Sequence, residues 1–203
     1  MCSVDIDPRS QIPPKEYTDA FRDAAQPIAM EPIGYVESPY KERFGTPRQP
    51  VVTKLTAGGR QEGAIVITRK DMLPHALQDL DGFTHCWLIA HMHLNTGYKS
   101  LVRPPRGPKD VKRGLLATRA PHRPNQLSLS ALQITHVDAA AGRIGVLGLD
   151  LLDGTPVLDV KPYVPPFDSF PEARYGWIEE LSDGDALGAD RLDYWPPPAH
   201  LDG

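Results

Sequence analysis

The chain has 203 residues, which is enough for one sizeable domain and marginal for two. Its 22 prolines favour many turns and short elements over long helices, and its net charge of −4 argues against a general nucleic-acid binder. No apolar run is long enough to span a membrane, and two cysteines cannot build a disulfide framework or a four-ligand zinc site. The first residues lack the apolar core of a signal peptide, so we expect a cytoplasmic protein.

The sequence predicts three regions. Residues 1–27 form an N-terminal appendage with one short helix that begins at Pro14. Residues 28–166 form the main body, and residues 167–203 form an acidic C-terminal extension. One helix is expected at 71–80, with Asp71 as its cap and Pro74 in its first turn. The body otherwise consists of predicted strands, at 28–37, 51–56, 64–68, 83–94, 114–118, 127–137, 143–151 and 157–163.

This excess of strands predicts an all-β fold, an antiparallel barrel or sandwich, and argues against alternating β-α-β units. Residues 97–113 are too rich in proline and charge for a strand and form a long, proline-rich excursion, of the kind that is often functional. From Lys99 to Arg123 basic residues are opposed by one acid, Asp110. A basic segment in an acidic protein fits an anion-binding or RNA-binding face, and it fits a solvated loop equally well.

The sequence GLLATRAPHRPNQLSLS, at 114–130, is the most informative segment. It places Arg119, His122, Arg123 and Asn125 within seven residues, in a turn shaped by two prolines. Such side chains are costly to order and fill a core poorly, so two guanidiniums held between apolar strands indicate a grip on an anion. A solvated loop with chance arginines is the alternative.

Histidines and acids mark two other places. In a strand, His85, His91 and His93 all point to one face, and a His-x-His pair can offer two imidazoles to a metal. No glutamate follows before Glu172, so pocket lining or ring stacking is the favoured role and we predict no metal. The segment DLLDGTP reads as a hairpin turn, or as a negative rim that holds a cation. No Gly-x-Gly-x-x-Gly motif supports a Rossmann methyl-donor fold.

Five segments together resemble the TsaA-like family, the TrmO-type tRNA methyltransferases. They are IGYVESPYKERFGTPRQP, DLDGFTHCWLIAHMH, RPPRG, GLLATRAPHRPN and LDLLDGTPVLDVKPYVP, and their order, spacing and chemical character agree with the family over residues 32–166. The resemblance implies a barrel-like all-β fold, a homodimer, and S-adenosylmethionine as methyl donor. It implies methylation of N6 of threonylcarbamoyladenosine, next to the anticodon of tRNA.

Carried over residue by residue, the resemblance also implies a donor pocket. An arginine can hold the donor's carboxylate through two parallel bonds, aspartates suit its ammonium or ribose and favour its positive sulfonium, and leucines suit the adenine. The implied residues are Pro47, Arg48, Gln49, His93, Arg119, Leu129, Asp150, Leu151, Leu152 and Asp153.

Methyl transfer is a one-step displacement that depends mainly on alignment, so the sequence assigns no catalytic residue. His93 and Tyr163 are the candidates to test. The basic residues expected to face RNA are Arg103, Arg106, Lys109, Lys112, Arg113 and Arg123. Three positions depart from the family pattern: Leu94 replaces a glutamine, Gln126 a proline and Ser128 a glycine.

Three alternatives stay open at this point. The same donor can serve a different acceptor, either a small molecule or another RNA. The chain can be a non-enzymatic module that binds S-adenosylmethionine, or a metal-dependent barrel enzyme built on His85, His91 and His93.

Overall fold

The computed structural model describes residues 28–42, 62–104, 108 and 110–181. The chain divides into two compact units, Met1–Glu31 and Pro32–Gly203, and the elements below belong to the second. Several predictions lie outside the described residues: the helix in 1–27, the strand at 51–56, the donor-pocket residues Pro47, Arg48 and Gln49, and the RNA-facing candidates Arg106 and Lys109.

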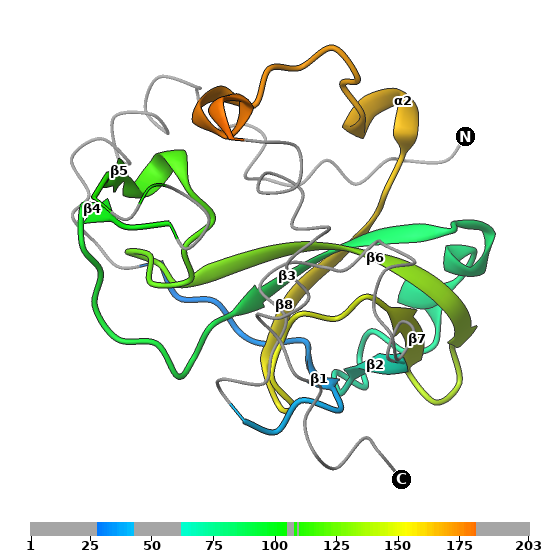
Figure 1. The fold of residues 1–203 in the computed structure, drawn as a ribbon. Helices are drawn as coiled ribbons and strands as arrows, with labels where there is room; N and C mark the ends of the chain where they lie inside the picture. Colours follow the sequence, from blue (N-terminus) through cyan, green and yellow to red (C-terminus); the bar gives the residue numbers. More distant parts are fainter. Residues whose placement is uncertain (1–27, 43–61, 105–107, 109, 182–203) are drawn as a thin grey trace, which may run out of the picture. The chain divides into compact units, whose positions relative to one another are not determined.

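Six strands close into an antiparallel barrel in the order β1-β2-β7-β6-β3-β8 (Figure 1). Their bounds are β1 Gly34–Glu37, β2 Glu62–Ile67, β3 His85–His91, β6 Leu127–Asp138, β7 Arg143–Leu147 and β8 Pro156–Pro162. The short strands β4 (Leu101–Val102) and β5 (Arg113–Gly114) pair in a separate two-stranded sheet. The predicted all-β barrel is therefore confirmed.

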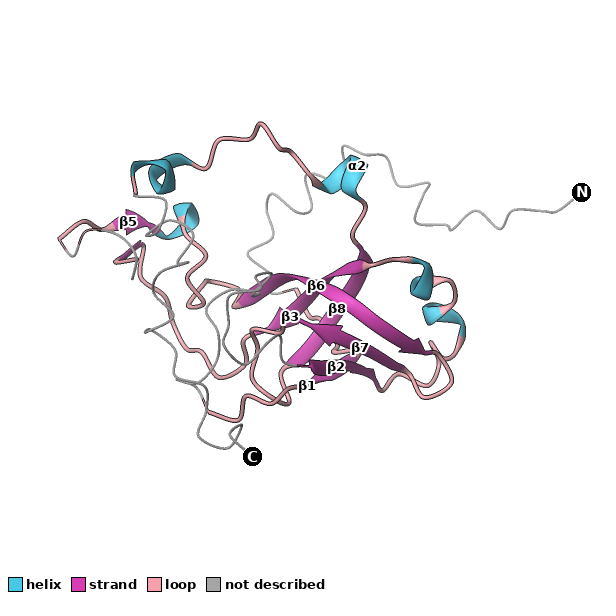
Figure 2. Ribbon diagram, turned by 45° about the vertical axis from the view of Figure 1, so that its right-hand side comes forward, coloured by secondary structure: helices cyan, strands magenta, loops and turns pink. Residues whose placement is uncertain are grey.

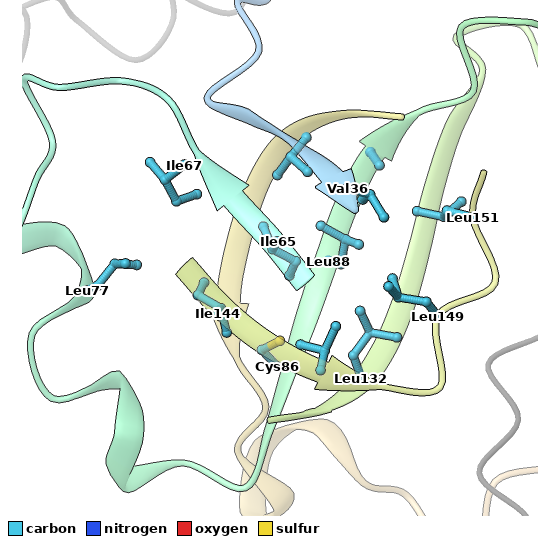
Figure 3. Close-up of a cluster of buried hydrophobic side chains, with 13 residues drawn as sticks. Val36, Ile65, Ile67, Leu77, Cys86, Leu88, Leu132, Ile144, Leu149 and Leu151 are labelled. Carbon is cyan, nitrogen blue, oxygen red and sulfur yellow. The ribbon is translucent and has the colours of Figure 1, made fainter. Parts of the chain in front are cut away.

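Alternation along the strands explains the barrel's interior. In β3, Cys86, Leu88 and Ala90 are buried, whereas the residues between them are only partly covered. The inward residues of the other strands meet them in one cluster, as Figure 3 shows for Ile65 and Leu132 among others. Burial of this apolar surface is the main favourable term in folding, and it fixes which face of each strand turns inward.

The predicted helix at 71–80 is wrong. The segment forms two 3₁₀ turns instead, η2 (His75–Leu77) and η3 (Leu80–Gly82). A residue that precedes a proline is disfavoured in the α-helical region, which affects Leu73, and Asp79 has a left-handed backbone with φ of 63° that cannot continue a helix. The apolar stripe nevertheless packs on the core through Leu77.

The predicted strand at 114–118 is also wrong for most of its length. Only Gly114 belongs to β5, and Leu115–Ala117 form the 3₁₀ turn η4. The Leu115 carbonyl accepts bonds from the Thr118 amide at 3.1 Å and the Thr118 hydroxyl at 2.9 Å, and such local bonds compete with a strand ladder. Conversely, the excursion at 97–113, expected to hold no strand, contains the two residues of β4 and the first residue of β5.

After β8 the chain continues into two short helical turns. These are α2 (Pro165–Asp168), whose entry is fixed by a 2.7 Å bond from the Val164 amide to the Asp168 carboxylate, and the 3₁₀ turn η5 (Gly176–Glu180). Among the described residues, no helix has both the length and the apolar character that a membrane crossing requires.

Gly34 is the glycine on which the closure of the barrel depends. It pairs with Ile67 on one side and Val157 on the other, and a Cβ at this position would overlap the Val66 carbonyl oxygen. Gly34→Ala should lower the free energy of unfolding by about 1–3 kcal/mol, because backbone must move to admit the methyl group. Urea denaturation measures this. In the control Gly82→Ala the new Cβ meets nothing within 4 Å, so equal losses in both variants would contradict the argument.

Candidate functional site

A carboxylate and a serine meet at the centre of the site. Ser130 points inward from β6, is only 2% exposed, and donates a hydrogen bond of 2.7 Å from its hydroxyl to Oδ1 of Asp150. Asp150 is half-buried in the loop that joins β7 to β8. A buried serine hydroxyl needs a hydrogen-bond partner, and here the partner is a carboxylate that is itself half-buried.

Asp150 interacts electrostatically with two further side chains, Arg119 and Tyr40. Burial raises the pKa of Asp150 to about 6, against the lowering effects of the Ser130 bond, a backbone bond and the positive charge of Arg119. Burial also raises the pKa of Tyr40 to about 12, with a second contribution from the negative charge of Asp150. Arg119 and Tyr40 therefore lie within the electrostatic reach of the same carboxylate. Perturbed groups of this kind concentrate at functional sites.

Asp153 holds the loop in place. Its Oδ1 accepts the Ser38 amide at 2.9 Å, and its Oδ2 pairs with the Lys41 ammonium at 2.7 Å. Burial alone would raise the pKa of Asp153, but Lys41 and the Ser38 amide hold it below its ordinary value. The Asp153 amide donates to the Tyr40 carbonyl at 2.9 Å, so the same residue fixes the Tyr40 segment beside the Asp150 loop.

The predicted turn at Asp153 and Gly154 is present, but the predicted hairpin is wrong, because the strands on either side, β7 and β8, are not neighbours in the barrel. Gly154 has φ of 73°, a left-handed conformation that glycine adopts without strain, and its amide donates to the Val36 carbonyl at 2.8 Å. The site is thus tied to β1 by backbone as well as by side chains.

The two arginines of the 114–130 segment have different surroundings. The Arg123 guanidinium donates to the Thr118 carbonyl at 3.0 Å and the Leu115 carbonyl at 3.5 Å, and is half-buried. Arg119 is exposed, and its charge acts on Asp150. The hydrogen bonds of Arg123 give it a part in shaping the loop, and Arg119 is the more exposed of the two arginines.

The histidine face of β3 is confirmed as far as His91. His85 and His91 share the partly covered outer face, whereas His93 is exposed beyond the end of the strand. His91 Nε2 lies 3.2 Å from Oε1 of Gln126. Within the described ranges, no three or more His, Cys, Asp or Glu side chains are placed to hold a metal ion.

Gln126 and Ser128, which depart from the family pattern, both contact the end of β3. Gln126 has a left-handed backbone with φ of 52°, and its carbonyl accepts the Met92 amide at 2.8 Å. The Ser128 hydroxyl donates to the Ala90 carbonyl at 3.3 Å. The substituted loop therefore keeps contact with the strand that carries His91.

The two catalytic candidates are not brought together. Tyr163 lies at the start of β3, where its amide bonds the His85 carbonyl at 3.0 Å and its ring centroid is 5.3 Å from that of Trp87. His93 follows the opposite end of the same strand.

The three candidate leucines present different surfaces. Leu151 is 2% exposed and packs in the barrel core, so only its backbone is available to a ligand. Leu152 is half-buried, and its carbonyl accepts the Thr155 hydroxyl at 2.7 Å. Leu129 is 58% exposed, because β6 turns its neighbour Ser130 inward and Leu129 outward.

Sequence reasoning missed Ser130, Tyr40 and Lys41. The signal for Ser130 was a polar residue at an inward position of the alternating segment LSLSAL. Tyr40 and Lys41 both contact Asp153, more than a hundred positions later in the chain, and the sequence pattern holds no signal for such contacts.

The structure is thus a small closed antiparallel barrel, with a half-buried aspartate in the loop between β7 and β8 on which the positive charge of an arginine acts. The chain belongs to the tRNA-methyltransferase O N-terminal domain family, whose model matches residues 35–169. This confirms the resemblance found in the sequence.

Relatives and solved structures agree. The chain is 38% identical over 156 residues to the tRNA (adenine(37)-N6)-methyltransferase of Escherichia coli, a match that covers 74% of this chain and 63% of that protein. It is 39% identical over 147 residues to the mouse protein of the same name, covering 70% of this chain and 32% of the relative. A crystal structure of TrmO superposes with a TM-score of 0.59 at 35% identity, covering 75% of this chain and 63% of that one. The chain thus spans less than two thirds of these relatives.

Proposed function

We propose that this chain is an S-adenosylmethionine-dependent methyltransferase that methylates N6 of threonylcarbamoyladenosine beside the anticodon of tRNA. Family membership and the names of the relatives support the reaction class. The observation that carries the proposal is a half-buried Asp150, bonded to Ser130, on which the positive charge of the exposed Arg119 acts; the two charges suit a donor that bears a carboxylate at one end and positive charge on its ammonium and sulfur.

Each charged side chain has a task that follows from its chemistry. Arg119 binds the donor's carboxylate through paired bonds. Asp150, ionised above its pKa of about 6, favours the positive sulfonium over the neutral product, which helps the product to leave. The family resemblance adds Pro47, Arg48, Gln49, His93 and Asp153 to the proposed pocket, and it adds Leu129, Leu152 and the backbone of Leu151 for the adenine.

The reaction itself is a displacement at the methyl carbon, in which the acceptor nitrogen attacks, the carbon–sulfur bond breaks and the nitrogen loses its proton. The protein's main contribution is alignment of nitrogen, carbon and sulfur. His93 and Tyr163 stay candidates for a weak base, to be tested by His93→Ala and Tyr163→Phe.

We also propose a homodimer in the cytoplasm. The support is the family resemblance and two exposed leucines on the outer face of β6, Leu127 beside His91 of β3 and Leu129 beside Ile89. Light scattering after size exclusion tests the dimer.

Two measurements test the function. Titration calorimetry should show S-adenosylmethionine binding, and nucleoside mass spectrometry of tRNA from a deletion strain should show loss of the methylated threonylcarbamoyl nucleoside. Persistence of that nucleoside in a strain without a second copy of the gene would contradict the tRNA role, while donor binding alone would favour the donor-binding module.

The basic excursion gives a prediction for tRNA binding. Arg103 and Lys112 are exposed, whereas Arg113 is paired with Glu180. The double substitution Arg103→Gln with Lys112→Gln should reduce the slope of log affinity against log salt by about 2, because each lost phosphate contact removes about one unit. Filter binding over a salt series measures the slope. Lys70→Gln, an exposed change outside the excursion, is the control, and an unaltered slope in the double variant would make the excursion a solvated surface.

A further inference from the structure

The C-terminal turn η5 contacts the excursion that precedes Arg119. The turn lies beyond residue 169, where the match to the family model ends. Figures 1 and 2 both place it beside β5 and away from the barrel strands. We call the five residues Gly176–Glu180 the C-terminal clamp.

Three contacts join the clamp to β5, at the end of the excursion, and to η4, which follows it. The Trp177 indole N–H donates to the Ala117 carbonyl at 2.8 Å. The Arg113 guanidinium lies over the same indole, 5.3 Å from the ring centroid, and its Nη2 pairs with the Glu180 carboxylate at 3.0 Å. A bond, a cation–π contact and an ion pair thus converge on η4 and the strand before it.

The clamp is itself held in shape. The Glu179 carboxylate accepts the Tyr175 amide at 2.8 Å and the Arg174 guanidinium at 2.9 Å. Both residues come immediately before the clamp, so Glu179 closes the turn on itself and leaves Trp177 and Glu180 to reach the excursion.

Carbonyls of η4 and of the residue after it accept hydrogen bonds from two side chains. Arg123 donates to the Leu115 and Thr118 carbonyls, and Trp177 donates to the Ala117 carbonyl, two residues before Arg119. The Ala120 amide, on the far side of Arg119, bonds the Thr118 hydroxyl at 3.3 Å. The backbone that carries Arg119 is thus fixed before and after it, and one of the fixing residues comes from outside the matched domain.

We propose that Trp177 is a positioning residue for the methyl-donor site, which holds the Arg119 loop in its binding conformation through the Ala117 carbonyl. The inference rests on the proposed function, since it assigns Arg119 to the donor. It adds a contribution from a segment that lies beyond the family domain.

The test uses the full chain and three variants. Trp177→Phe keeps a ring beside Arg113 but removes the N–H donor. Glu180→Gln keeps the indole but removes the ion pair, and it serves where the first variant does not fold. Tyr175→Phe is the matched control, because the Tyr175 side chain is 62% exposed and only its amide contacts Glu179.

Hydrogen exchange and titration calorimetry with S-adenosylmethionine are the two readouts. In Trp177→Phe, exchange at 115–120 should accelerate while the barrel strands stay protected, and the donor's Kd should rise at least fivefold. With tRNA as acceptor, KM for the donor should rise and kcat at saturating donor should stay near that of the parent. Glu180→Gln should shift exchange and Kd in the same direction by less.

Two results would overturn the clamp's role. One is unchanged exchange at 115–120 in both variants. The other is faster exchange with a donor Kd within twofold of the parent chain. A parent chain that binds no donor at all would instead contradict the proposed function, and the clamp's role at the donor site with it, so the two failures are distinguishable.

Discussion

Replacing Arg119 with alanine should weaken S-adenosylmethionine binding about 10- to 150-fold, which corresponds to about 1.5–3 kcal/mol for a hydrogen bond to a charged group. The guanidinium is exposed on a loop whose backbone is fixed on both sides, and its charge acts on Asp150 across the site. Its loss removes the partner of the donor's carboxylate and one source of the field on Asp150. Titration calorimetry at neutral pH measures the change.

Two control variants sharpen this result. Arg119→Lys keeps the charge but not the planar pair of donors, so it should recover only part of the affinity. Arg69→Ala removes an arginine whose ion pair with Asp71 is exposed and should leave affinity unchanged. A folded Arg119→Ala chain that binds the donor as tightly as the parent chain would exclude Arg119 from the pocket.

The barrel could be predicted from sequence because its strands are recognised by the alternation of neighbouring residues. In β3 each inward residue is apolar, and the alternation alone assigns the faces of the strand. The two segments that were predicted wrongly depend on backbone details that alternation does not encode. Pro74 and the left-handed Asp79 break the helix, and the Thr118 hydroxyl turns the segment after β5 into a 3₁₀ turn.

The site was predictable only in part for a related reason. A motif can place Arg119 and Arg123 in one loop, but it cannot show that Arg123 is half-buried and binds backbone carbonyls of that loop while Arg119 is exposed. The Asp150 environment depends on Ser130, from a strand twenty positions earlier. Nothing in the sequence around Asp150 indicates how much water its carboxylate loses.

Desolvation of the ionised Asp150 carboxylate lowers the free energy of unfolding by a measurable amount. Its pKa is about 6 in the folded chain, above the unfolded value of about 4, so folding favours its protonated form. The stabilising contribution is complete below pH 4 and is lost as pH rises from about 4 to 6. Above pH 6 the ionised carboxylate lowers the free energy of unfolding by at most about 3 kcal/mol. Solvent screening reduces this figure, because Asp150 is only half-buried.

Asp150→Asn should therefore stabilise the fold at pH 7–8 by about 1–2 kcal/mol while it weakens donor binding about tenfold. Asparagine keeps an acceptor for the Ser130 hydroxyl and removes the charge, so the gain comes from desolvation and the loss from the donor's positive groups. Urea denaturation and calorimetry measure the two effects on one preparation.

The pH series separates this explanation from a change in packing. In the parent chain, donor affinity should fall as pH drops below 6 and Asp150 takes up its proton, whereas in Asp150→Asn it should be flat over the same range. Between pH 4 and 6 the parent's free energy of unfolding should carry a downward contribution with rising pH that the variant lacks. An Asp150→Asn chain that is less stable at pH 8 would show that the carboxylate is not desolvated. A variant whose donor affinity keeps the parent's pH dependence would show that Asp150 is not the group that selects the cationic donor.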